Sequence, residues 1–166
     1  MTPPDSNNVK LVELDEARFL EYRKHLVRDY AADKVRAGTW SPAEAQSNEG
    51  RGRLLPEGPA TRDHLLYVVR ADTVPTSVGT VWFALGDLGV GRSVWIYEII
   101  IHENFRRYSY ASRTLDLVEH KAAQLGATNV GLHVSGHNQG AQALYKNKGY
   151  TITSITMAKP IQSDYR

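Results

Sequence analysis

The chain has 166 residues, the usual size of one domain, and contains no cysteine, which excludes disulfides, thiolate metal sites and a cysteine nucleophile. Lysine and arginine number 20 against 18 acidic residues, and the basic residues are scattered, so nothing indicates a nucleic-acid partner. No stretch approaches the roughly 18 apolar residues of a membrane span, and the first eight residues do not resemble a signal peptide, so we expect a cytoplasmic protein with no membrane partner.

The N-terminal part predicts a tail, a strand and a helix. Residues 1–8 are rich in Pro, Ser and Asn and should form a flexible tail, followed by a single domain over residues 9–166. Residues 9–14 fit a short strand. Apolar side chains then recur at helical spacing with charged residues between them, which predicts an amphipathic helix over residues 16–36.

A second helix start is encoded by Ser41-Pro42-Ala43-Glu44. These residues supply an N-cap serine, a proline at the first helical position and a glutamate three residues after the cap. We expect this helix to end before the turn cluster at residues 55–58.

The middle of the chain is typical of a β-meander followed by a helix. Residues 65–70, 78–85 and 94–101 are rich in Val, Ile, Trp and Tyr and are separated by turn signals. The period then changes from two to about 3.6, which predicts a helix over residues 111–125, with Gly126 as its stop.

The C-terminal part alternates between strand and helix. Residues 128–134 fit a strand, and residues 138–148 fit a helix that is capped by Asn138 and stopped by Gly149. Residues 151–157 fit a last strand.

An anion site is expected where the strand over residues 94–101 leads into the long helix. The first turn of a helix presents unpaired N–H groups and the positive end of its dipole, which together bind phosphate. Arg106 and Arg107 lie in the connecting loop. They would bind phosphate there, or else be ordinary solvated loop charges.

This loop carries a family resemblance. Arg106-Arg107-Tyr108-Ser109-Tyr110-Ala111 resembles the R-x-x-G-x-G/A pyrophosphate loop of GNAT acetyltransferases, with Ser109 in place of the first glycine. A serine at positive φ costs on the order of 1 kcal/mol, although its hydroxyl could donate to a phosphate oxygen. The resemblance implies that this loop, continued by Ser112, binds the pyrophosphate of coenzyme A.

A second segment is similar to the same family. Asn138, Ala141, Leu144-Tyr145 and Gly149-Tyr150 follow the family's N-x-x-A-x-x-L-Y-x-x-x-G-[FY] signature. The resemblance implies that Asn138 contacts the pantetheine arm and that Tyr145 lies near the sulfur as general acid. On position alone, Tyr145 could equally be a core tyrosine.

The resemblance also implies roles for the strand before the loop. The backbone of Ile99, Ile100 and Ile101 would bind the pantetheine arm. Glu98 stands among apolar residues of this strand and is a candidate general base with a raised pKa, or a member of a structural ion pair. His133 is a second candidate base, or else a core histidine whose ring nitrogens have hydrogen-bond partners.

Together these features imply an α/β fold of three layers: a mixed, mostly antiparallel sheet with helices on both faces and a splayed central strand pair. The expected function is transfer of an acetyl group from acetyl-CoA to a primary amine by direct attack in a ternary complex. A non-catalytic acyl-CoA-binding or regulatory module of the same fold is the alternative.

The acceptor would be a small-molecule or peptide amine, and a homodimer is compatible with the sequence. Tyr22, Tyr30 and Trp82 are candidates to line the acceptor cleft, or else core aromatics. No metal site is expected, because Arg106 occupies the second histidine position that H-E-x-x-H would need after His102.

Overall fold

The structure is a computed structural model and describes residues 8–47 and 53–162, so most of the predicted tail and the predicted end of the second helix lie outside the described residues. The elements in chain order are β1 (Val9–Glu13), α1 (Glu16–Arg36), α2 (Pro42–Ser47), η2 (Gly58–Ala60), β2 (His64–Ala71), β3 (Ser77–Asp87), β4 (Arg92–Ile101), η3 (Glu103–Phe105), α3 (Tyr110–Gln124), β5 (Asn129–Leu132) and α4 (Gln139–Asn147).

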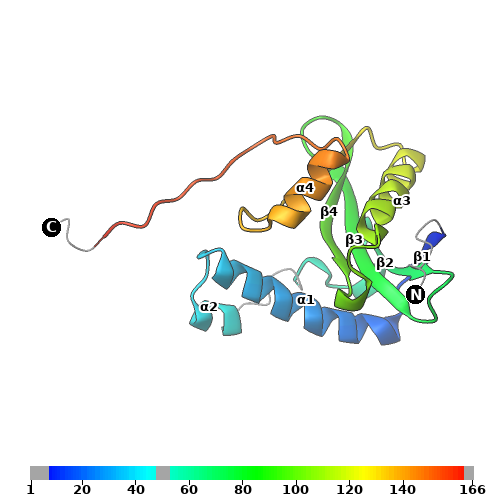
Figure 1. Cartoon of the computed structure of the whole chain (residues 1–166), viewed down its shortest axis with the longest axis horizontal. Helices are drawn as coiled ribbons and strands as arrows, with labels where there is room; N and C mark the ends of the chain where they lie inside the picture. The colour runs from blue at the N-terminus through cyan, green and yellow to red at the C-terminus, as the bar shows by residue number, and fades with distance from the viewer. Residues whose placement is uncertain (1–7, 48–52, 163–166) are drawn as a thin grey trace.

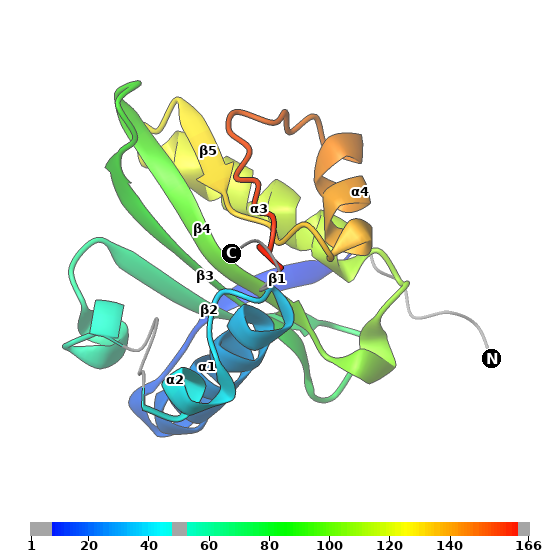
Figure 2. The ribbon, with the colours of Figure 1, turned by 90° about the vertical axis from the view of Figure 1, so that its left-hand side faces the viewer.

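The strands form one sheet in the order β1-β2-β3-β4-β5. Each neighbouring pair up to β4 is antiparallel, whereas β4 and β5 are parallel. Helices α1 and α2 lie on one side of the sheet, and α3 and α4 lie on the other (Figures 1 and 2). The predicted three-layer α/β fold is confirmed. No helix in the described ranges is long and apolar enough to cross a bilayer.

Each face of the sheet has its own apolar core, and β2 contributes to both. Leu66 and Val68 pack with the α1 side chains on one face. Tyr67 and Val69 alternate with them and pack with the α3 side chains on the other. A strand buried on both faces has no polar side to alternate with, which explains the nearly continuous apolar run of β2.

Local signals positioned the helix starts correctly. The Asp15 carboxylate accepts a hydrogen bond of 2.8 Å from the Arg18 N–H at the start of α1. The predicted capping box of α2 is also present, because Glu44 Oε2 accepts from the Ser41 N–H at 2.7 Å and Ser41 Oγ accepts from the Glu44 N–H at 3.2 Å.

Strand β4 pairs unequally with its two neighbours. Its pairing with β5 ends at Ile96↔Leu132, whereas its pairing with β3 continues to Ile101↔Gly79. The β5-facing edge of β4 is therefore outside the sheet pairing over residues 97–101. This is the predicted splay between the central strands.

A β-bulge lies at the point where the strands begin to separate. Trp82 pairs with Glu98 and the adjacent Phe83 pairs with Ile96, so Tyr97 is the extra residue of β4. A bulge changes which face the following side chains take. Glu98 therefore faces α1, whereas Val94 and Ile96 pack on the α3 side.

The predicted last strand is wrong. Residues 151–162 carry no strand or helix and are exposed throughout. Figure 1 shows this C-terminal arm running away from the body of the protein beyond α4. The sequence has strand composition, but among the described residues no neighbouring strand pairs with it, and a lone strand has no ladder hydrogen bonds.

Gly79 of β3 lies close against the backbone of β4. A Cβ at this position would collide with the backbone carbonyl oxygen of Ile100, which cannot move without disturbing the β3–β4 ladder. Gly79→Ala should destabilise the fold by about 1–3 kcal/mol, which corresponds to a fall in Tm of roughly 2–12 °C for a protein of this size.

Gly86→Ala is the matched control for this change. Gly86 is also in β3, but a Cβ there would meet no atom within 4 Å. The free energy of unfolding of Gly86→Ala should change by no more than a surface substitution changes it, about 0.5 kcal/mol. Equal Tm values for the two variants in thermal unfolding would show that the close approach at Gly79 is not rigid.

Candidate active site

The loop between β4 and α3 has the conformation that an anion-binding turn requires. Ser109 is the N-cap of α3 and is left-handed, with φ 62° and ψ 12°. Arg107 is also left-handed, with φ 65°. The Ser109 side chain caps no N–H of the helix, so the first-turn donors of α3 depend on another partner.

The two loop arginines are held differently. Arg106 Nε donates a hydrogen bond of 3.1 Å to the carbonyl oxygen of Ile101, the last residue of β4. Arg107 is exposed beside the left-handed Ser109. Arg106 therefore fixes the loop to the strand, whereas Arg107 presents its charge to solvent next to the start of α3.

The surroundings of this loop are electropositive. Burial lowers the pKa of His102, and the neighbouring His25 and Arg106 lower it further. Several positive groups gathered at a helix N-terminus favour an anionic ligand.

Glu98 is aimed into the opposite face of the sheet by the bulge. The Tyr22 hydroxyl of α1 donates a hydrogen bond of 2.7 Å to Glu98 Oε2. Glu98 is half-buried, and it does not share a face with Val94 and Ile96 as the simple alternation predicted. The extra residue Tyr97 is the physical reason for this error.

An aromatic stack lies beside Glu98. The Tyr97 ring stacks on Trp82 at 4.4 Å between centroids and on His64 at 5.6 Å. Trp82 Nε1 donates to His64 Nδ1 at 2.9 Å, and burial lowers the pKa of His64. The unprotonated nitrogen of a neutral imidazole can accept this hydrogen bond.

The three aromatic residues expected at the acceptor cleft are placed differently. Trp82 is the cross-strand partner of Glu98, but it is fully buried and so belongs to the core. Tyr30 packs edge-on against Trp40 at 5.5 Å, next to α2. Tyr22 reaches Glu98 through its hydroxyl.

A pocket of about 390 Å³ opens on the same face as Tyr97, at the β3–β4 hairpin. Its lining includes Tyr97, Trp95, Leu88 and Asp87. Trp95 and Tyr97 alternate with Val94 and Ile96 along β4, so the ordinary period of a strand brings both rings to this pocket.

The segment after β5 carries three predicted site residues. Asn138 caps α4 as predicted, since its Oδ1 accepts from the Ala141 N–H at 3.1 Å. Tyr145 is half-buried, and its ring lies 5.7 Å from that of Tyr150. His133 is exposed just beyond the end of β5. The interpretation of His133 as a buried core histidine is therefore wrong.

Both layers of helices hold this segment in place. Asp33 of α1 accepts a hydrogen bond of 2.8 Å from Ser135 Oγ and lies 3.0 Å from His137 Nε2. At the other end of α4, the Tyr150 hydroxyl donates to Glu119 of α3 at 3.0 Å. These contacts fix the two ends of α4, and therefore Tyr145, relative to α1 and α3.

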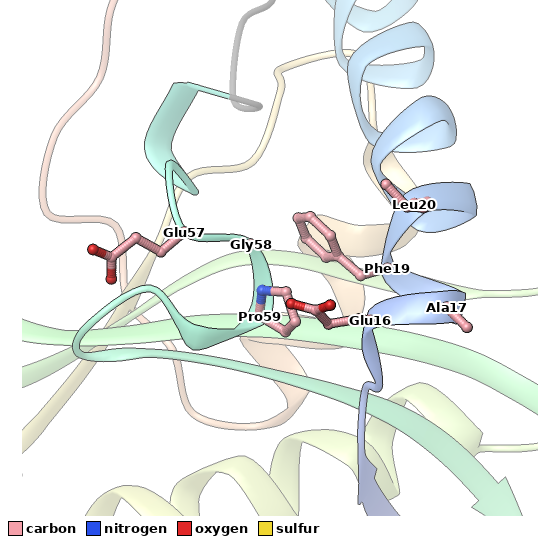
Figure 3. A pocket seen from close by; sticks show the side chains of 7 residues that line it. All are labelled: Glu16, Ala17, Phe19, Leu20, Glu57, Gly58 and Pro59. Atoms are coloured by element: carbon pink, nitrogen blue, oxygen red, sulfur yellow. The ribbon is translucent and has the colours of Figure 1, made fainter.

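The described residues contain no cluster of three or more side chains suited to bind a metal ion. A second pocket, of about 420 Å³, lies between the start of α1 and the Gly58–Ala60 turn (Figure 3). Phe19 and Pro59 face it, but none of the predicted site residues lines it. We therefore place the candidate site at the β4–β5 splay.

Comparison with known proteins agrees with the α/β fold described above. The model of the acetyltransferase (GNAT) family matches residues 22–150. The chain belongs to this family. The family consists of acetyltransferases that use acetyl-CoA as the acetyl donor, so the general activity of this protein is acetyl transfer.

The similar proteins cover nearly the whole chain. The uncharacterized N-acetyltransferase YycN from Bacillus subtilis (strain 168) is 30% identical over 92% of this chain and 99% of its own. Its crystal structure has a TM-score of 0.88 at 29% identity, covering 94% of this chain and 100% of YycN. YdgE, an uncharacterized N-acetyltransferase from the same strain, is 29% identical over 91% of this chain and 97% of its own.

A more distant solved structure has the same fold. AAC(6')-Iy, in complex with the bisubstrate analog CoA-S-monomethyl-acetylneamine, aligns with a TM-score of 0.61 at 12% identity. The alignment covers 94% of this chain and 99% of that chain.

The left-handed Ser109 generates a testable prediction. Ser109→Gly should raise the free energy of unfolding by about 1 kcal/mol, because glycine has no Cβ to strain at φ 62°. Ser109→Ala is the control, since it removes the hydroxyl and keeps the strain. Urea unfolding measures both variants. Equal stabilisation by glycine and alanine would show that the backbone strain is not the cause.

Proposed function

We propose that this protein is an N-acetyltransferase that moves the acetyl group of acetyl-CoA to a primary amine by direct attack in a ternary complex. We also propose that residues 9–166 act as one catalytic domain. The observation that carries the proposal is the course of β4. Its edge leaves β5 at Ile96 and continues to Ile101, and the chain then enters the loop before the uncapped N-terminus of α3.

The coenzyme would lie along this path. Arg107 and the N–H groups from Tyr108 through Ser109, Tyr110 and Ala111 to Ser112 would bind the pyrophosphate, with Arg106 holding the loop. The backbone of Ile99, Ile100 and Ile101 would bind the pantetheine arm within the splay. Asn138, at the start of α4, would contact the same arm from the β5 side.

The chemistry would use two side chains from different layers. Glu98 would take a proton from the ammonium group, and the free amine would then attack the acetyl carbonyl carbon. Backbone N–H groups near Ile99 would hold the oxyanion until the C–S bond breaks. Tyr145 would protonate the leaving thiolate, and His133 remains a second candidate for the base.

An acyl-enzyme on cysteine is excluded, because the chain has no cysteine. The acceptor amine would approach from the face where Tyr97 and Tyr22 flank Glu98. The pocket at Tyr97 and Trp95 offers aromatic surface with Asp87 at its edge, which suits a cationic amine. This composition favours a small-molecule or peptide amine over a neutral acceptor.

Acetyl-CoA binding is the first test. A ligand at a hundredfold excess over its Kd stabilises the folded state by about 2.7 kcal/mol, which predicts a Tm rise of roughly 5–11 °C. Arg107→Ala should remove a large part of this rise, whereas Arg62→Ala, in an exposed loop before β2, should not. No shift of the parent protein in millimolar acetyl-CoA would contradict the coenzyme assignment.

Turnover separates an enzyme from a binding module of the same fold. Thiol release from acetyl-CoA should increase with at least one member of an amine panel. Coenzyme binding without amine-dependent thiol release across the panel would favour the non-catalytic acyl-CoA-binding alternative.

Tyr145→Phe tests the proposed acid. A general acid contributes about 10² to 10⁴ in rate, so kcat should fall at least tenfold while acetyl-CoA affinity changes little. Tyr67→Phe is the matched control, because Tyr67 packs in the core on the α3 side of the sheet and has no part in the proposed chemistry. Parental kcat in Tyr145→Phe would make Tyr145 a packing residue and contradict this mechanism.

A further inference from the structure

The pocket at the β3–β4 hairpin, which we call the hairpin pocket, has an aromatic wall. Tyr97 and Trp95 line it from β4, and Leu88 lines it from the hairpin turn. The Trp95 ring lies against Gly131 of β5, where a Cβ would stand 3.0 Å from two ring carbons and 3.1 Å from Leu88 Cδ1. Because Gly131 has no side chain, Trp95 and Leu88 can pack over β5 and form this wall.

The polar side chains of the hairpin pocket favour a positively charged ligand. The Asp87 carboxylate accepts a hydrogen bond of 2.7 Å from the Gly89 N–H through Oδ1, which leaves Oδ2 for a ligand. Ser93 is buried, and its hydroxyl donates to the Gly91 carbonyl oxygen at 2.9 Å, so its proton is already used. None of the described residues that line the pocket is basic. A carboxylate beside two aromatic faces suits an ammonium group.

The hairpin pocket and the proposed base lie on the same face of the sheet, a short distance apart. Trp95 precedes Glu98 by three residues in β4, and Asp87 follows Trp82, the cross-strand partner of Glu98, by five residues in β3. At about 3.3 Å per residue, these separations are about 10 Å and about 16 Å. Tyr97 lines the pocket and directly precedes Glu98. One elongated molecule can therefore reach both places.

We propose that the acceptor is an amine with a second cationic group, and that the hairpin pocket binds this second group while the reacting amine lies at Glu98. The inference rests on the proposed acetyl transfer and names the class of acceptor for it. The Asp87 carboxylate and the faces of Trp95 and Tyr97 hold the far ammonium group. Its charge, rather than a neutral tail, selects the acceptor.

Only the near amine changes in the reaction. It loses one proton and forms an N–C bond to the acetyl carbon, the C–S bond of acetyl-CoA breaks, and the thiolate takes up a proton. The far ammonium group keeps its proton and its charge. The acetylated end of the product is a neutral amide, which cannot replace the ammonium group at Asp87. A diamine should therefore accumulate as its monoacetylated product, with a much slower second transfer.

Three acceptors separate charge from length. 1,8-Diaminooctane is long enough to reach from Glu98 to the rings of Trp95 and Tyr97, 1,3-diaminopropane is too short, and octylamine has the length without the second charge. The thiol-release assay should give 1,8-diaminooctane a kcat/KM at least about fivefold above each of the other two, which is the effect of about one partly exposed ion pair.

Asp87→Asn tests the carboxylate. Asparagine keeps the oxygen that accepts from the Gly89 N–H and removes the charge. The preference for 1,8-diaminooctane over octylamine should fall at least about threefold, through KM rather than kcat, because the far group is bound equally in the ground and transition states. Asp63→Asn is the matched control. The Asp63 carbonyl oxygen accepts from the Leu85 N–H at 2.9 Å beside the pocket, but Asp63 does not line it, so the parental preference should remain.

Calorimetric titration of the same amines distinguishes this inference from the proposed function, because it requires no turnover. The parent should bind 1,8-diaminooctane at least about fivefold more tightly than octylamine, and Asp87→Asn should remove most of this difference. That result without thiol release by any amine would support the cation site and contradict the proposed function. Equal affinity, or equal kcat/KM, for 1,8-diaminooctane and octylamine in the parent would overturn the inference even if both are acetylated.

Discussion

The backbone hydrogen bonding of β4 is the constraint on which the rest of the structure depends. This strand pairs with β3 to Ile101 but with β5 only to Ile96, so one of its edges is left without a ladder partner. Backbone polar groups require partners, and an extended ligand with amide groups can supply them. The bulge at Tyr97 lies at the same point and turns Glu98 toward Tyr22 of α1. The bulge and the end of the β4–β5 pairing thus occur at the same point of one strand, and the proposed coenzyme path and acceptor face lie on either side of it.

Backbone strain is concentrated at the loop that follows. Arg107 and Ser109 are both left-handed, although neither is glycine. Such conformations persist only where the surroundings hold them, and here Arg106 ties the loop to the Ile101 carbonyl oxygen. The result is a helix start whose N–H groups are presented outward, next to exposed positive charge. In the proposed function this helix start binds the pyrophosphate, and Ser109 takes the left-handed conformation without being a glycine.

The position of α4 depends on contacts to both helical layers, and this connects the site with the C-terminal arm. Asp33 holds the segment before α4, and Glu119 holds the residue after it through Tyr150. Beyond Tyr150 the chain makes no further element within the described residues. The arm therefore extends from a fixed point.

The sequence by itself determined what local interactions decide. Periodicity and caps such as the Ser41–Glu44 box and Asn138 located the helix starts within a residue or two, since a helix is closed by contacts within one turn. The tertiary structure alone decided the face of Glu98, the burial of Trp82, the exposure of His133 and the unpaired arm. The Ser135 contact with Asp33 joins residues 102 positions apart, and no local pattern records it. A strand likewise has no internal hydrogen bonds, so its composition predicts a strand at residues 151–157 but cannot supply the partner that would make it one.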